Sequence, residues 1–77
     1  MIVKYIEVKN QVDLLSTVTK IESCGFNRVS YLGELSFKRI RENYHGNSKI
    51  LIKLYFNNIL NRKEWQITTK SIENSYK

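Results

Sequence analysis

The helical spacing of the apolar residues between positions 11 and 24 is the feature that most constrains this fold. Four of them form one stripe: Leu14, Leu15, Val18 and Ile21. That spacing is typical of a helix with one buried face. Asn10 precedes the stripe as a predicted N-cap, and Gly25 follows it as a residue that tolerates a left-handed backbone. The sequence therefore predicts a helix over about 11–24.

Most other apolar residues fall in runs typical of strands. The β-branched and aromatic run 2–8 predicts a first strand, and residues 28–32 predict a second. The second strand is expected to continue to about residue 43, because apolar residues keep one parity on both sides of Gly33, which then marks a bulge. The alternative is that Gly33 ends the strand in a turn.

Two further strands are expected in the second half of the chain. Gly46-Asn47 is a two-residue hairpin signal, and it predicts that the strand ending near residue 43 pairs with a strand over 49–56. This register places Lys38 opposite Tyr55 and gives 49–56 a core face of Ile50, Ile52, Leu54 and Phe56. Residues 64–70 predict a last strand that turns Trp65, Ile67 and Thr69 inward, and 71–77 are expected to fray.

These elements predict one small α+β domain that spans residues 1–77. One helix packs on a mostly antiparallel sheet of about four strands, in the order β-α-β-β-β. A core of this size rarely supplies more than about 3–5 kcal/mol. A homodimer that buries additional surface is therefore one expectation, and a marginally stable monomer is the alternative.

The residue types for catalysis and metal binding are scarce. Cys24 and His45 are the sole cysteine and histidine. Cys24 ends the apolar stripe, so we expect a buried and inert thiol, and we expect His45 beside a turn. A metal site needs several ligands at short spacing, and the glycines are isolated, unlike those of a phosphate-binding loop. We predict a non-enzymatic protein with no catalytic residue, no metal and no cofactor.

Charge is unevenly distributed along the chain. The net charge is +6, and all of it comes from residues 36–77, which contain nine Lys or Arg and three Glu. Such asymmetry indicates an anionic partner. The alternative is an ordinary solvated surface that keeps a small protein in solution.

The candidate partner-binding residues are cations and tyrosines of that basic half: Lys38, Arg39, Arg41, Tyr44, Lys49, Lys53 and Tyr55. On the predicted register, Lys38, Lys53 and Tyr55 share one sheet face, which could hold phosphates by charge and stack a base on the ring. Nucleic acid is the first partner predicted. The rivals are a host protein that docks on the hairpin tip or a sheet edge, and a structural or assembly subunit that dimerises.

Composition adds a hint of origin and location. The chain lacks Ala and Pro and is rich in Lys, Asn, Ile and Tyr, as expected of an AT-rich genome such as that of a low-GC bacterium or a phage of one, which is consistent with a phage or mobile-element protein. Charged residues interrupt the apolar start, so neither a signal peptide nor a membrane segment is predicted. The lone cysteine fits a reducing compartment. We expect a cytoplasmic protein.

Overall fold

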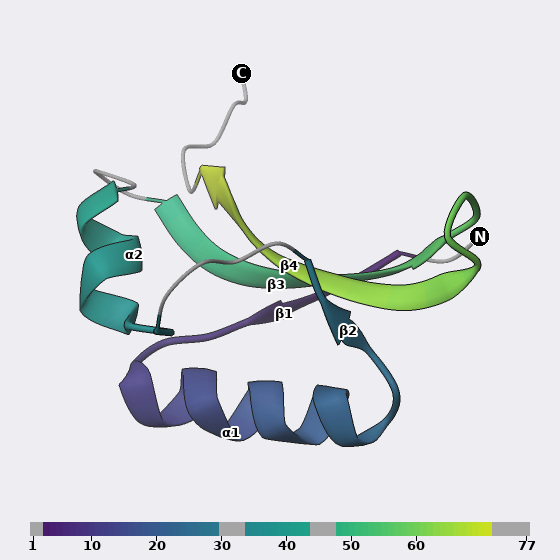
Figure 1. The fold of residues 1–77 in the computed structure, drawn as a ribbon. Coiled ribbons are helices and arrows are strands. Elements are labelled where there is room, and N and C mark those ends of the chain that lie inside the picture. Colours follow the sequence, from purple (N-terminus) through teal and green to yellow (C-terminus); the bar gives the residue numbers. More distant parts are fainter. Residues whose placement is uncertain (1–2, 30–33, 44–47, 72–77) are drawn as a thin grey trace.

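The computed structural model describes residues 3–29, 34–43 and 48–71. Four strands and two helices follow one another along these residues: β1 (Lys4–Glu7), α1 (Gln11–Ser23), β2 (Asn27–Arg28), α2 (Phe37–Asn43), β3 (Ser48–Asn57) and β4 (Arg62–Ser71). Figure 1 shows α1 beneath one face of a curved sheet and α2 at the end of the sheet where β3 begins. No helix in the described ranges is both long enough and apolar enough to span a membrane.

The strands form one sheet in the order β1-β3-β4-β2. The β1–β3 and β3–β4 pairs are antiparallel, and the short β2 pairs with β4 in parallel. Strands β1 and β2, which α1 connects, therefore lie at opposite edges with the β3–β4 hairpin between them. The predicted α+β class, with a helix on a mostly antiparallel four-stranded sheet, is confirmed.

Helix α1 begins and ends where its sequence signals predict. The Asn10 side chain accepts a hydrogen bond from the Asp13 backbone N–H at 2.9 Å, and the Asp13 carboxylate accepts one from the Lys9 N–H at 2.9 Å. The first bond satisfies a donor that the first turn leaves unpaired, and the second pairs the N–H of the residue before the N-cap. Gly25 ends the helix with a φ of +93°, a conformation that side chains rarely adopt. Leu15 lies at the edge of the stripe and is exposed.

The core lies between α1 and the face of the sheet that we call the inner face. Its residues come from both layers: Val8, Leu14, Val18, Ile21, Ile40, Ile50, Ile52, Leu54 and Trp65. Strand residues alternate between faces, so the even-numbered apolar residues of β3 point inward, as predicted for Ile50, Ile52 and Leu54. Phe56, the fourth residue assigned to that face, is exposed near the hairpin end. The opposite face of the sheet, which we call the outer face, has neither helix against it.

The predicted long strand over 28–43 is wrong, because residues 37–43 form helix α2. The Ser36 hydroxyl accepts a hydrogen bond from the Arg39 N–H, and the Ser36 carbonyl accepts one from the Ile40 N–H at 3.0 Å. Helical spacing turns Ile40 into the core, with Phe37 packed against it. A strand there would also find no partner, since β1 and β4 occupy both sides of β3.

The predicted pairing across Gly46-Asn47 fails for the same reason, and residues 44–47 lie outside the described part of the chain. The hairpin observed in the structure joins β3 to β4 instead, with Asn57 opposite Arg62. Asn57 closes its turn by accepting hydrogen bonds from the Ile59 and Leu60 N–H groups, each at 2.9 Å. Asn61 adopts the left-handed φ of 56° that the tight turn requires.

The remaining strand predictions need smaller corrections. The second strand comprises Asn27–Arg28, and the Val29 N–H donates to the Trp65 carbonyl at 3.1 Å. Residues 30–32 of the predicted strand and the predicted bulge at Gly33 lie outside the described part of the chain. Strand β4 includes Ser71, which was assigned to a frayed tail, and residues 72–77 are not among those described. Cys24 is exposed and not buried, because it follows the last turn of α1 and does not continue its inward stripe.

Candidate functional site

The outer face gathers aromatic, cationic and polar side chains in rows that cross β1, β3 and β4. One row runs Tyr5–Lys53–Gln66 and the next runs Glu7–Leu51–Thr68. Both rows consist of directly opposed residues, so their side chains stand beside one another on the same face. The outer face is therefore a continuous surface and not a set of separated residues.

Lys53 lies between two tyrosines on this face. Tyr5 is directly opposite Lys53 and is 55% exposed. Tyr55 follows Lys53 on the same face of β3, and the Lys53 Nζ lies 5.3 Å from the centre of the Tyr55 ring. Tyr5 and Tyr55 are therefore diagonal neighbours across β1 and β3, a relation in which residues are about 7–8 Å apart. The Lys53 ammonium group thus contacts the Tyr55 ring as a cation–π pair, and Tyr5 is the residue opposite Lys53 on β1.

The Tyr55 ring is held in place by its hydroxyl, which reaches the residue opposite on β4. This hydroxyl donates a hydrogen bond to Glu64 Oε1 at 3.0 Å. Burial of the hydroxyl, followed by the hydrogen bond to Glu64, raises the pKa of Tyr55 above its ordinary value of 10.0. Tyr55 therefore stays neutral, with a fixed ring orientation, throughout the physiological pH range.

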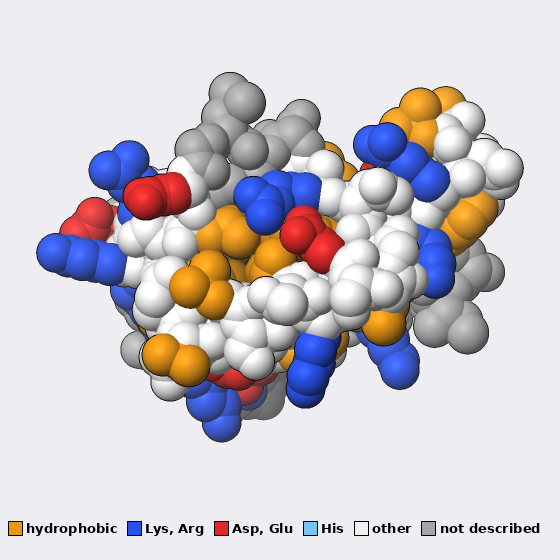
Figure 2. Space-filling model, turned by 60° about the horizontal axis from the view of Figure 1, so that its bottom comes forward, with side chains coloured by type: hydrophobic (Ala, Val, Ile, Leu, Met, Phe, Trp, Pro, Cys, Tyr) orange, Lys and Arg blue, Asp and Glu red, His pale blue; other side chains and the backbone are white. Residues whose placement is uncertain are grey.

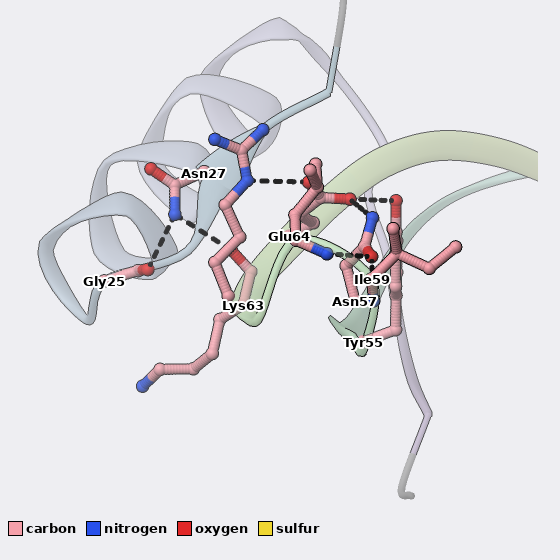
Figure 3. A network of polar contacts seen from close by, with 9 residues as sticks. Gly25, Asn27, Tyr55, Asn57, Ile59, Lys63 and Glu64 are labelled. Carbon is pink, nitrogen blue, oxygen red and sulfur yellow. Dashed lines mark hydrogen bonds and ion pairs between the residues drawn. The ribbon is translucent and has the colours of Figure 1, made fainter.

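Glu64 is the centre of a polar network at the base of the hairpin (Figure 3). Its side chain is 4% exposed, and Oε1 also accepts a hydrogen bond from Asn57 Nδ2 at 2.9 Å, while Oε2 accepts from Arg62 Nε at 2.7 Å. The hydrogen bonds from Asn57 and Arg62 lower the pKa of Glu64 below its ordinary 4.5, against the opposing effect of burial. One carboxylate thus fixes the Tyr55 ring and the hairpin turn together.

The lowered pKa of Glu64 predicts how the free energy of unfolding depends on pH. A carboxyl group whose pKa is lower in the folded state stabilises the fold above its unfolded pKa, and this contribution is lost as pH falls through the folded pKa. We expect the free energy of unfolding of the wild type to exceed that of Glu64→Gln by a constant amount above about pH 5 and by less as pH falls below about 4.5. Urea unfolding followed by the fluorescence of the single tryptophan measures this difference. A difference that persists unchanged into strong acid would contradict the network.

A shallow hollow opens on the outer face between β1 and the β3–β4 pair. Its lining combines an aromatic ring, an acid, a cation, an apolar residue and two threonines, of which Thr69 has the parity of the inner face because it pairs with Ile50: Tyr5, Glu7, Lys49, Leu51, Thr68 and Thr69. The hollow has a volume of about 460 Å³, and Leu51 is only 8% exposed. One apolar, largely covered residue therefore lies among polar side chains in this hollow.

The structure brings together part of the predicted site. Lys49, Lys53 and Tyr55 share the outer face, whereas Lys38 and Arg39 are exposed on α2 and not on the sheet. Arg41 is also on α2, where its guanidinium donates to the Ser48 carbonyl at 2.9 Å and lies 5.6 Å from the Phe37 ring centre. Tyr44 lies outside the described residues.

Tyr5 and Glu7 are functional candidates that sequence reasoning missed. The alternation in 2–8 separated Val3 and Tyr5 from Ile2, Ile6 and Val8, but it did not reveal which strand lies next to them. The sequence did indicate that the first strand must pair with another apolar strand, but it did not indicate which one. Only the register of β1 with β3 shows that Tyr5 meets Lys53.

The cations of the outer face differ from several others in their surroundings. Within the described ranges, ion pairs join Arg28 to Glu22 at 3.3 Å and Arg62 to Glu64 at 2.7 Å, and neither includes Lys49 or Lys53. Figure 2, in which the α1 side comes forward, shows Lys and Arg side chains spread apart on that side with acidic side chains beside some of them. Lys49 and Lys53 therefore form no ion pair with the acidic residues that the structure describes.

No group of three or more His, Cys, Asp or Glu that could hold a metal ion occurs among the residues that the structure describes. Comparison with known protein families, with curated proteins and with solved structures finds no match to this chain.

Proposed function

We propose that this chain is a non-enzymatic protein that binds single-stranded nucleic acid on its outer sheet face. The observation that supports this function best is the row in which Tyr5 stands opposite Lys53, with Tyr55 as the next residue of the same face. Aromatic rings stack on unpaired bases whatever their sequence, and lysines neutralise the phosphates between them. A base can lie on a ring only when it is unpaired, so a single strand fits this face better than a duplex.

Each group has a distinct task in this proposal. Tyr5 and Tyr55 offer ring surfaces to two bases, while Lys49 and Lys53 contact the phosphates. The hydrogen bond from Tyr55 to Glu64 fixes one ring before the strand arrives, which lowers the entropy cost of binding. With few phosphate contacts, the affinity is expected to be modest and to depend on salt.

Salt dependence provides the experiment for this function. For single strands, each neutralised phosphate contributes about 0.7 to the slope of log affinity against log salt. We expect Lys49→Gln/Lys53→Gln to flatten that slope by about 1.4 and Lys53→Gln alone by about 0.7. Fluorescence anisotropy of a labelled oligo(dT) strand, titrated between about 50 and about 200 mM salt, measures the slopes.

Lys20→Gln is the matched control, because it removes the same charge from an exposed position on α1. The control should keep the slope of the wild type. Equal slopes for Lys53→Gln and Lys20→Gln would show that the outer face does not hold the phosphates.

The β3–β4 hairpin tip favours a second candidate function, the docking of a host protein. Ile59 is 93% exposed and Leu60 is 56% exposed, on a turn that the Asn57 side chain closes. Figure 1 shows this end of the hairpin curling away from α1. A fixed, protruding aliphatic pair is suited to fill a pocket on a partner, since little conformational freedom is lost on binding.

Substitution of Ile59 and Leu60 distinguishes this second candidate function, protein docking, from nucleic-acid binding. A host protein that the wild type retains after nuclease treatment, and that Ile59→Asn/Leu60→Asn releases, would favour docking through the tip. Retention by both proteins would exclude the tip as the contact.

A further inference from the structure

Glu7 is the unexpected residue of the outer face. It lines the hollow beside Tyr5 and Lys49, and it is exposed on β1. Glu64, the other acid on this face, is buried and bonded to Arg62, whereas the ion pairs of the described residues do not include Glu7. A carboxylate beside a phosphate-binding surface repels the strand, unless it accepts hydrogen bonds from the base.

Only donors can satisfy this carboxylate, because an ionised Glu accepts hydrogen bonds and donates none. Among the bases, guanine presents two adjacent donors on its Watson–Crick edge, N1–H and N2–H2. Thymine presents one donor between two carbonyl oxygens, and cytosine and adenine each present one amino group beside an acceptor. A two-oxygen acceptor therefore fits guanine best.

We propose that the hollow is a base-recognition site that prefers guanine, with Glu7 as its specificity-determining residue. This inference rests on the proposed nucleic-acid function and names the base that the same face reads. The guanine ring stacks on Tyr5, its two donors meet the Glu7 carboxylate, and Lys49 contacts a neighbouring phosphate. Leu51 forms the apolar floor, and the Thr68 hydroxyl can serve the remaining edge of the base.

The size of the preference follows from the exposure of the site. Bidentate contacts to a base discriminate by about 5- to 150-fold. The hollow is open to solvent and Glu7 is exposed, so we expect the lower end, about five- to tenfold. The surface would thus bind strands of most sequences but prefer guanine at one position.

The test compares four oligo(dT) strands that carry guanine, adenine, cytosine or thymine at one central position. In fluorescence anisotropy at fixed low salt, the wild type should bind the guanine strand about five- to tenfold more tightly than the all-thymine strand. Glu7→Gln should lose this preference, while its affinity for the all-thymine strand rises because a negative charge is removed. A purely structural role for Glu7 would not produce these two opposite changes.

Glu42→Gln is the matched control, because it makes the same substitution at an exposed position on α2. It should keep the guanine preference of the wild type. If the wild type binds all four strands equally, or if Glu7→Gln keeps the preference, guanine recognition by Glu7 is overturned while the proposed function stands. If the wild type binds none of the strands, the proposed function fails and this inference fails with it.

Discussion

Trp65→Ala is expected to leave the protein largely unfolded at 25 °C. Trp65 is 1% exposed on β4, and its indole N–H donates to Glu22 Oε2 on α1 at 3.0 Å. Truncation of a buried tryptophan costs about 3–5 kcal/mol, which is about as much as one core of this size supplies. Circular dichroism and urea unfolding measure the loss.

Two further variants serve as controls for the Trp65→Ala truncation. Ile59→Ala removes apolar atoms that are already in solvent, so its free energy of unfolding should stay within about 0.5 kcal/mol of the wild type. Trp65→Phe keeps much of the ring but leaves Glu22 without its indole partner, so we expect it to be intermediate. A Trp65→Ala protein as stable as the wild type would contradict the packing of α1 on β4.

Tyr5→Ala is expected to weaken oligonucleotide binding by about 5- to 150-fold without unfolding the protein. Stacking of a base on an aromatic ring contributes about 1–3 kcal/mol by alanine substitution. Tyr5 is exposed at the sheet edge, so its truncation spares the core. The slope of log affinity against log salt should stay unchanged, because Tyr5 neutralises no phosphate.

Tyr5→Phe is the control for the stacking contribution, since it keeps the ring and removes only the hydroxyl. Its affinity for oligo(dT) should remain close to that of the wild type. If Tyr5→Ala binds as tightly as Tyr5→Phe in the anisotropy titration, then Tyr5 does not stack on a base and the outer face loses its aromatic platform.

Local signals explain why some of the fold could be predicted from the sequence. Helix α1 has an N-cap at Asn10, a stripe at helical spacing and a glycine at its end, and each signal acts within a few residues. Strand β4 likewise alternates, with Trp65 buried and Ile67 packed against the core. These elements were predicted to within about two residues because neighbouring residues determine them.

The basic segment was predicted wrongly because two periodicities overlap in it. Leu35, Phe37, Arg39 and Arg41 share the parity of a strand, whereas Phe37 and Ile40 have the spacing of a helix. The structure follows the second pattern, with Ser36 at the start of α2 and Ile40 in the core. Ser36 ahead of an apolar pair was the missed signal, and Gly46-Asn47 drew attention to the wrong turn.

The candidate site depends on contacts between residues far apart in the sequence. Tyr5 and Lys53 are brought together by the pairing of β1 with β3, and no local pattern specifies that pairing. The parity of β3 did predict that Lys49, Lys53 and Tyr55 point away from the core. The sequence thus predicted the outer-face residues of β3, and the register of β1 with β3 added those of β1.

Amide chemical-shift mapping by NMR, with oligo(dT) added to the labelled protein, tests most directly whether the outer face binds the strand. We predict that the largest shifts fall on outer-face residues of β1, β3 and β4, among them Tyr5, Lys53 and Thr68, while exposed α1 residues such as Val12 and Lys20 stay unchanged. Shifts confined to α1, or no shifts at saturating strand, would contradict the proposed function.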